Sequence, residues 1–500
     1  MSRSRRDALR PRALAAVDGV PVPTLLGRHA DGIDAAAQAD DIAAREGFLQ
    51  VRFLAAYFRS GIDMARGELD LAAHHERVAA EFVDAAKPLQ AALLAACAAW
   101  RGLYGQDWIE ACAHGERSMQ VARTLAAPSY RIHYGIPYVA GLLECGATDV
   151  ARAVLDEQRR AIAGTALDCF VPLLLAVEAR GSECAGDPVR ARQLVADLWR
   201  RAAEREHGRY LSWLKPWMSR YADWGLQDGV EPGFIRTMIA TYGWQPEPDC
   251  SAHWPWPVRI QPLGRFEVTV NGAPLQFGRK LPRRPLDLLR ALVAHGGGVP
   301  EHTLADHLWP ELEADAAHKS LGAALHRLRA LLGQADAVIL KGARLSLAPR
   351  RVWVDASAFG AAIESCRALT PGADEHLASA RRARELYRGA FLADDRDDAW
   401  ILSTRERLRG RFIQLVDATA RALESGARHR DAADWYESGI EVDDLAEAFH
   451  HGLMRCLIEL DCEPDAIRAY RRLQRVLSRA FGRSPSPSIE ALYLSIASAV

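Results

Sequence analysis

The sequence predicts a mainly α-helical protein in which helical repeats lie on both sides of a smaller α+β module. Three observations support this prediction. Leu, Ala and Arg are abundant while Asn occurs once, at Asn271, which favours helix over strand. Glycines recur at a nearly constant interval through the first half of the chain. Only residues 258–355 combine strand-like alternation with hairpin turn signals.

Composition places the chain among soluble globular proteins. Its 500 residues suggest about three domains, and 49% hydrophobic with 25% charged residues is ordinary for that class. Nine cysteines are scattered without a Cys-x-x-Cys pair, so we expect reduced thiols rather than disulfides or a zinc site. We expect no signal peptide, and no stretch reaches the roughly 18 apolar residues of a membrane span. The sequence therefore predicts a cytoplasmic protein with no metal, cofactor or membrane partner.

Charge is distributed unevenly, although the net charge is −1. Residues 258–350 carry 13 Lys and Arg against 8 Asp and Glu. Residues 1–257 carry 29 against 32, and residues 351–500 carry 21 against 24. One basic segment between two acidic ones is typical of a nucleic-acid-binding module with other domains attached.

The amino-terminal half is predicted to be a helical repeat. Residues 1–34 are rich in Arg, Pro, Gly and Asp and are expected to form a loose lead-in. From 35 to 243 the apolar pattern is helical, and glycines in short polar breaks mark turns at a nearly regular spacing. A repeated helix–turn–helix is typical of an α-solenoid similar to tetratricopeptide units, with an irregular helical bundle as the alternative. The marker glycines are Gly67, Gly105, Gly146, Gly186 and Gly225.

A linker is expected at residues 244–257. It contains Pro246, Pro248, Pro255 and Pro257, and proline disfavours helix both at its own position and before it. The three tryptophans of this segment are expected to pack against a neighbouring domain.

Residues 258–355 alternate between strands and helices. The segment 263–277 reads as a hairpin with Asn271-Gly272 as its turn. A helix over 285–295 follows, and then a short helix that ends at Trp309-Pro310. After the helix over 315–332, residues 337–347 read as a second hairpin and 352–354 as a strand. Three helices followed by a two-stranded wing predict a winged helix-turn-helix.

The helix over 315–332 is the candidate recognition helix. At about 100° per residue, one stripe is apolar and the opposite face carries cations with small residues between them. No acid occurs from Ala316 to Ala335, and Asp315 is expected to cap the helix with Gly333 as its stop. A cationic face with small residues can approach a DNA major groove closely. The apolar stripe consists of Leu321, Ala324, Leu325, Leu328 and Leu332.

The carboxyl-terminal part is predicted to be helical and repetitive. Asp431, Ala432 and Tyr436 recur further along the chain as Asp465, Ala466 and Tyr470. The spacing between the two sets equals the tetratricopeptide period, so residues 356–500 are expected to form a helical domain of that kind.

These motifs together resemble the SARP family of bacterial transcriptional activators. In residues 258–355 the resemblance to the OmpR-type winged helix rests on LGRFEVTVNG, RRPLDLLRALVAHGG, LADHLWP, the spacing of AAHKSLGAALHRLRALLG, and RLSL leading to WVDASAF. In residues 356–500, YRGAFL, WILSTRERLRGRF and AYRRLQRVLSRAFGRSPSPSIEALY look like the bacterial transcriptional activation domain of that family. One departure is Gly342-Ala343-Arg344-Leu345, where the family often has Gly-Tyr-Arg-Leu in the wing.

The resemblance implies which residues face DNA. In the family the third helix enters the major groove and the wing touches the backbone or minor groove. The implied third-helix contacts are Lys319, Ala323, His326, Arg327 and Arg329, and the wing contacts are Lys341 and Arg344. The cluster Arg279, Lys280, Arg283 and Arg284, ahead of the first helix, is interpreted as a phosphate clamp, with a plain surface patch as the alternative.

The sequence thus predicts a sequence-specific DNA-binding transcriptional regulator, an activator by family resemblance, with no enzymatic activity. Double-stranded DNA and RNA polymerase are the expected partners. The amino-terminal repeats are expected to bind a protein or small-molecule effector or to form a homo-oligomer on DNA. The alternative is a tetratricopeptide-type scaffold protein whose winged helix contacts proteins rather than DNA.

Overall fold

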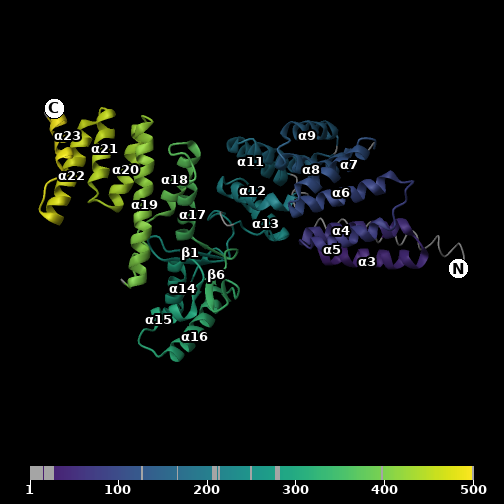
Figure 1. Ribbon diagram of the computed structural model, residues 1–500, viewed down its shortest axis with the longest axis horizontal. Helices are drawn as coiled ribbons and strands as arrows, with labels where there is room; N and C mark the ends of the chain where they lie inside the picture. The colour runs from purple at the N-terminus through teal and green to yellow at the C-terminus, as the bar shows by residue number, and fades with distance from the viewer. Residues whose placement is uncertain are drawn as a thin grey trace. The chain divides into compact units, whose positions relative to one another are not determined.

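The computed structural model describes residues 28–125, 128–165, 167–204, 214–247, 250–275, 282–395 and 398–497, together with residues 15 and 211. The chain divides into two compact units, Met1–Trp254 and Pro255–Val500 (Figure 1). The division falls inside the expected linker 244–257. The finer division of the chain into a lead-in, a repeat domain, a linker, a winged helix and an activation domain stays a prediction.

The first unit consists of helices joined by short turns, as the helical repeat prediction requires. Its first described helix begins at His29, inside the expected lead-in. Among the described residues, none of the helices combines the length and the apolar character that a membrane crossing requires. The elements are α3 (His29–Glu46), α4 (Leu49–Arg66), α5 (Leu69–Ala80), α6 (Pro88–Gly105), α7 (Trp108–Ala122), α8 (Pro128–Glu144), α9 (Thr148–Ile162), the 3₁₀ turn Asp168–Phe170, α10 (Val171–Cys184), α11 (Pro188–Glu204), α12 (Lys215–Gln227) and α13 (Pro232–Tyr242).

Four of the five marker glycines lie at helix turns, and the fifth does not. Gly67, Gly146 and Gly186 adopt left-handed backbone angles after α4, α8 and α10, and Gly105 ends α6. Gly225 instead lies inside α12, where an added Cβ would come within 2.6 Å of side-chain atoms of Trp199 and Ile235. The glycine there permits close packing, so its prediction as a turn was wrong.

Helix pairs stack in order through this unit. Within the pairs α4–α5, α6–α7, α8–α9 and α10–α11 the helices pack on each other, and α4, α6, α8 and α10 also contact one another in sequence. This is the packing of an α-solenoid. The tryptophans of the expected linker are buried, and Trp244 packs against Trp199 and Tyr242 within this unit.

The second unit begins with two small sheets around three helices. The first sheet has strand order β3-β2-β1-β7 and the second has β4-β6-β5. The elements are β1 (Val258–Gln261), β2 (Glu267–Val270), β3 (Ala273–Pro274), α14 (Arg283–His295), β4 (Val299–Pro300), α15 (Glu301–Leu308), α16 (Ala314–Leu332), β5 (Val338–Lys341), β6 (Arg344–Leu347) and β7 (Val352–Val354).

Both predicted hairpins form. Asn271 and Gly272, with φ of 49° and 80°, make the turn between β2 and β3, as the Asn-Gly sequence predicts. The β5–β6 hairpin pairs in antiparallel register and is extended by β4, where Val299 pairs with Leu345. The sequence did not reveal that β7 pairs in parallel with β1, which closes the first sheet.

Seven helices follow in the described carboxyl-terminal residues. They are α17 (Asp355–Arg367), α18 (Asp374–Leu386), α19 (Ala399–Ser425), α20 (His429–Val442), α21 (Glu447–Glu459), α22 (Glu463–Phe481) and α23 (Pro487–Ala497). The residues of the predicted repeat lie at matching positions of α20 and α22, and Tyr436 and Tyr470 are both buried. The chain is therefore mainly α, with a small α+β part between helical repeats.

One hydrophobic core runs through the whole second unit, from Val258 in β1 to Ile496 in α23. The backbone also connects the strands to the carboxyl-terminal helices. Leu263 and Phe391 form an antiparallel bridge, and the Gly264 amide donates to the Ala390 carbonyl at 3.0 Å. The strands, α14 and the long helix α19 are therefore held together as a single packed unit.

Candidate nucleic-acid interface

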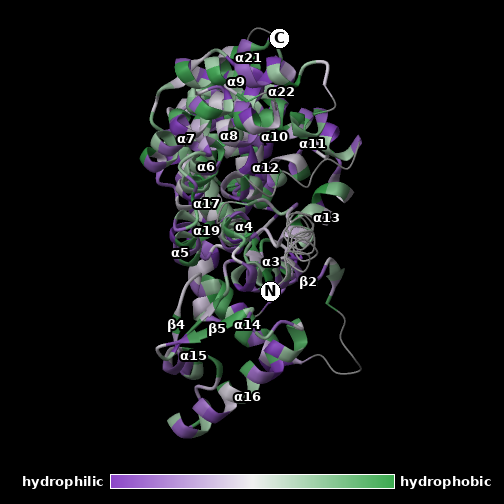
Figure 2. Ribbon diagram, turned by 90° about the vertical axis from the view of Figure 1, so that its right-hand side faces the viewer, coloured by the Kyte–Doolittle hydropathy of each residue, from purple (hydrophilic) through white to green (hydrophobic). Residues whose placement is uncertain are grey.

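Helix α16 has the two faces that its sequence predicts. All five residues of the predicted apolar stripe are buried, with Ala317 beside them. Figure 2 shows hydrophilic and hydrophobic residues alternating along this helix. Gly333 ends it with φ of 60°, as expected. The predicted cap was wrong, because Glu313 occupies that position and Asp315 lies in the first turn.

The exposed face of α16 brings four of the candidate residues together. Lys319, Ala323, His326 and Arg327 are all exposed, and they follow one another at short intervals that keep them on one side of the helix. With the described residues, Lys319, His326 and Arg327 form neither hydrogen bonds nor ion pairs. The face therefore presents the charged Lys319 and Arg327 and the imidazole of His326, whose hydrogen-bond donors are available to an external partner.

His318 belongs to the same face and was missed from the sequence. It is exposed and lies directly before Lys319, one turn ahead of Gly322. The helical period alone could have identified it, because residues 318, 322 and 326 fall on one line of the helix surface.

Arg329 holds the wing instead of facing outward. Its Nε and Nη2 donate to the carbonyl oxygen of Val338 at 3.2 and 2.8 Å, and the side chain is only partly exposed. Val338 is the first residue of β5, so this side chain fixes the hairpin to the end of α16. The sequence did not reveal this contact, because the strand carbonyl comes into reach only in the folded chain, and a DNA contact of Arg329 stays a prediction.

The two described arginines at the start of α14 differ in environment. Arg283 is exposed, and no hydrogen bond or ion pair joins it to another described residue. Arg284 donates to the Leu308 carbonyl at 2.7 Å, lies over the Trp309 ring and approaches Glu311 at 3.7 Å. It therefore braces α14 against the segment after α15 while half of its side chain stays exposed. Arg279 and Lys280 lie outside the described residues.

The wing ends in a tight two-residue turn. Gly342 and Ala343 have φ of 57° and 56°, the left-handed pair of a type I′ turn. Lys341 and Arg344 flank the turn and are exposed, and Arg344 donates to the Gly298 carbonyl. The Ala343 carbonyl accepts from the Glu301 amide at 3.0 Å, which ties the tip to α15. The alanine that replaces the family's tyrosine thus occupies a conformation that favours glycine.

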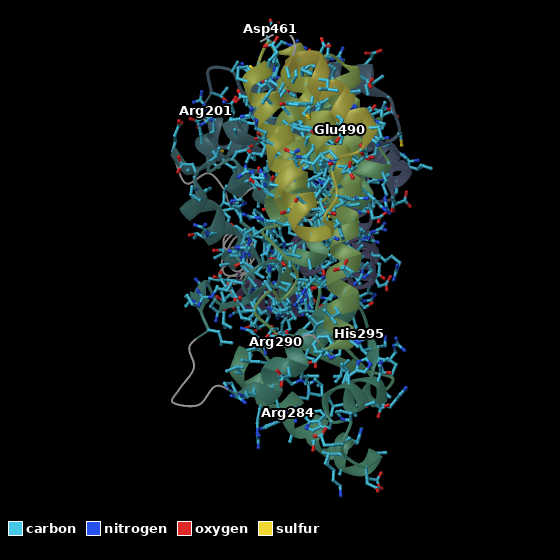
Figure 3. All side chains as sticks on the ribbon, turned by 90° about the vertical axis from the view of Figure 1, so that its left-hand side faces the viewer. Arg201, Arg284, Arg290, His295, Asp461 and Glu490 are labelled. Atoms are coloured by element: carbon cyan, nitrogen blue, oxygen red, sulfur yellow. The ribbon has the colours of Figure 1, made fainter. Side chains whose placement is uncertain are left out.

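A second set of polar contacts holds α14 against the carboxyl-terminal helices. The Ala294 carbonyl at the end of α14 accepts from Thr404 Oγ1 and Arg407 Nη2 at 3.3 and 3.4 Å. Arg290 forms ion pairs with Asp287 and Asp395 at 3.1 and 2.8 Å. Figure 3 labels Arg284, Arg290 and His295 in this part of the molecule. These contacts connect the base of the candidate interface to α19.

Asp355 is a buried carboxyl at the joint between the strands and α17. It is 1% exposed, accepts from the Leu263 amide at 3.3 Å and pairs with Arg388 at 3.3 Å. Burial raises the pKa of Asp355 to about 7, and the Leu263 amide and the Arg388 charge lower it only in part. Asp355 belongs to the WVDASAF segment, whose sequence does not reveal that the carboxyl is buried.

No group of three or more His, Cys, Asp or Glu side chains in the described ranges is arranged to hold a metal ion. What the second unit offers is a cationic helix face beside an exposed wing.

Parts of the chain are similar to known proteins. Residues 354–497 match the family described as the bacterial transcriptional activator domain. The transcriptional regulatory protein MoaR1 of Mycobacterium bovis is 25% identical over 250 residues, which are 48% of this chain and 79% of that protein. The transcriptional regulatory protein EmbR of Mycobacterium tuberculosis is 26% identical over 248 residues, 46% of this chain and 61% of EmbR, which is less than two thirds of its length.

Solved structures give weaker similarity. A structure of Mycobacterium tuberculosis EmbR in complex with a low affinity phosphopeptide is 22% identical and covers 49% of this chain and 65% of that one, with a TM-score of 0.37. The tetratricopeptide domain of P58(IPK) is 9% identical over 97% of this chain and 98% of that one, with a TM-score of 0.20. Both scores are below 0.5 and too low to establish a common fold.

Proposed function

We propose, on the premise that residues 354–497 form a bacterial transcriptional activator domain in a relative of transcriptional regulatory proteins, that this chain is a sequence-specific DNA-binding transcriptional activator. Helix α16 inserts its exposed face into the major groove of double-stranded DNA. The observation that carries the proposal is this face, where Lys319, His326 and Arg327 have no partner among the described residues and no Asp or Glu occurs from Ala316 to Ala335.

The candidate residues divide into base-reading and phosphate-holding groups. Arg327 lies in the middle of the exposed face, where a guanidinium can donate to guanine O6 and N7 together, and Lys319, Ala323 and His326 line the same groove. Arg283 and Lys341 flank the helix and hold phosphates. Arg284 and Arg344 brace the fold through carbonyl oxygens and keep exposed edges for phosphate contact.

The helical repeats are proposed to act as partner-binding regions. The carboxyl-terminal repeats contact RNA polymerase, and the amino-terminal solenoid binds a protein or small-molecule effector or forms a homo-oligomer on DNA. The proposed activity is cytoplasmic, involves no catalysis and needs no cofactor. Extended surfaces of stacked repeats are suited to such contacts.

A tetratricopeptide-type scaffold is the second candidate. Ile339 and Leu340 in β5 are 40% and 45% exposed, on a strand that is paired on one side only. Exposed apolar side chains on an edge strand favour a protein partner at the wing. In this alternative the winged helix contacts a protein and binds no DNA.

Titration of the full chain against DNA separates the two candidates. A duplex is selected from a random-sequence pool, and its affinity is compared with that of a scrambled duplex at several salt concentrations. The regulator predicts tighter binding of the selected duplex by at least about 10³-fold. It also predicts that log K falls by about 0.9 per phosphate contacted as log salt concentration rises. Failure of the pool to yield a bound duplex, or binding that is equal for both duplexes and does not change with salt, would favour the scaffold.

A further inference from the structure

Helix α22 carries a stripe of arginines on the side opposite its buried face. Ala466, Leu473 and Leu477 pack inward. At about 100° per residue, five exposed arginines fall within a sector about 100° wide on the outer side. They are Arg468, Arg471, Arg472, Arg475 and Arg479.

Acids are scarce along this stripe. No Asp or Glu occurs from Ala466 to Ile489, and Figure 3 marks Asp461 and Glu490, which lie on either side of this interval. Arg468 pairs with Asp465 at the amino end of the helix. Beyond it, the helix itself supplies no carboxylate to the remaining arginines.

Neighbouring helices do not supply the missing charge either. Arg471, Arg472 and Arg479 form no ion pair with any described residue. In the adjacent helices, by contrast, Arg455 pairs with Glu424 at 2.7 Å. These three exposed side chains are therefore available to an anionic partner.

A shallow hollow of about 410 Å³ lies at the carboxyl end of the stripe. Arg475 and Arg479 line it together with the hydroxyl-bearing Ser478 and Ser484, and Arg483, which pairs with Glu447 at 3.1 Å, lies at its edge. Arg475 donates Nε to the Arg471 carbonyl at 3.2 Å, which leaves its terminal nitrogens for another acceptor. Guanidinium and hydroxyl donors around one concave surface are suited to an oxygen-rich anion.

The chemistry of the stripe favours a phosphate backbone over an acidic protein. From Arg468 to Arg479 the helix rises about 16 Å, which is the axial length of about five successive phosphates in one strand of B-DNA. The cores of protein interfaces are depleted of charge and enriched in aromatic residues. The outer sector of α22 contains no apolar residue from Arg468 to Arg479, and the exposed Phe481 lies about 120° away from Arg475 around the helix.

We propose that this face of α22 binds the phosphate backbone of DNA outside the base pairs that α16 reads. The inference rests on the proposed function, since it adds a second DNA contact to the same regulator. Helix α22 packs on α21 and α23, whereas α16 packs on α14 and α15, so the two basic faces are separate surfaces. Flanking DNA bound at α22 adds affinity without adding sequence preference.

The test uses the full chain and a triple variant, Arg471→Gln, Arg475→Gln and Arg479→Gln. A matched control replaces three exposed arginines of the first unit, Arg152, Arg160 and Arg236, with Gln. A second variant changes the same three α22 residues to Lys. Each protein is titrated at several salt concentrations against the selected duplex in two lengths, one limited to the operator and one extended by flanking DNA.

On the long duplex, the Gln triple variant should lower the slope of log K against log salt concentration by about 3 units, since each lost phosphate contact removes about 0.9. On the operator-only duplex, the Gln triple variant should show the same slope as the parent. On the long duplex, the control variant and the Lys variant should also show the parent's slope, and the Lys variant does so because it keeps the charge. Circular dichroism and the melting temperature of each variant should match those of the parent, which checks that the substitutions leave the fold intact.

Two results would overturn this proposal, and they differ from failure of the proposed function. If the parent binds the selected duplex and the Gln variant shows the same salt slope on the long one, α22 does not contact DNA. If that variant instead loses binding to purified RNA polymerase, an acidic protein surface is the partner. If the parent binds no DNA at all, the proposed function itself fails, and this inference fails with it.

Discussion

Replacing Asp355 with Asn should change how the stability of the strand–helix joint depends on pH. The pKa of Asp355 rises from an ordinary value of 3.8 to about 7 in the folded protein because the carboxyl is buried. The folded state therefore keeps a proton that the unfolded state loses between about pH 4 and pH 7. The contribution of Asp355 to the free energy of unfolding is therefore fully present below pH 4. It is lost as the pH rises from about 4 to about 7, and it does not change further above pH 7. At 1.36 kcal/mol per pKa unit, the loss is about 4 kcal/mol.

The amide side chain of the Asp355→Asn variant stays neutral at every pH. The strand–helix joint of the variant should therefore not lose stability between pH 4 and pH 7. Hydrogen exchange of the Leu263 amide, which donates to the carboxyl, reports the opening free energy of the joint at each pH. The difference between variant and parent should move in favour of the variant by up to about 4 kcal/mol from pH 4 to pH 7.5. A difference that does not change with pH would show that the folded carboxyl is ionised throughout. A change in the opposite direction would show that pairing with Arg388 outweighs burial.

Three further predictions concern single residues. Arg327→Ala should weaken the binding free energy for the selected duplex by about 1–3 kcal/mol and relax the preference at one base pair. Arg283→Ala should weaken binding of the selected and the scrambled duplex equally. Titration of each variant with both duplexes measures these effects. Ala343→Gly should raise the thermal stability by about 0.5–1 kcal/mol, because glycine tolerates φ of 56°; an unchanged or lower melting temperature would contradict this. Gly225→Ala should cost about 1–3 kcal/mol in thermal denaturation through contact with Trp199 and Ile235, while Gly61→Ala, in open space on α4, should cost nothing; equal effects would refute the packing argument.

Local patterns in the sequence predicted most of the elements. The buried stripe of α16 follows from a helical period, and the β2–β3 turn follows from Asn271-Gly272, because both depend on residues close together in the chain. Gly225 was misplaced because its role depends on Trp199 in α11 and Ile235 in α13, which belong to other helices. Spacing alone cannot distinguish a glycine needed for a turn from one needed for close packing.

The candidate site was predictable only in part, for a related reason. Exposure of Lys319, His326 and Arg327 follows from the helical period, but the fate of Arg329 depends on where β5 passes. The burial of Asp355 depends on Leu263, far away in the sequence, and on Arg388. The sequence shows which side chains are charged, whereas the tertiary fold determines which group each charged side chain contacts.

The continuous core from Val258 to Ile496 has a consequence for the layout of a promoter. Helix α14 packs on both α16 and α19, so within the described residues α16 and the carboxyl-terminal helices belong to one packed unit. For a chain that reads DNA through α16, the direction of the operator then decides which way along the DNA the activator helices extend. Inverting the operator would turn those helices away from the transcription start, so such a regulator would act with a fixed polarity.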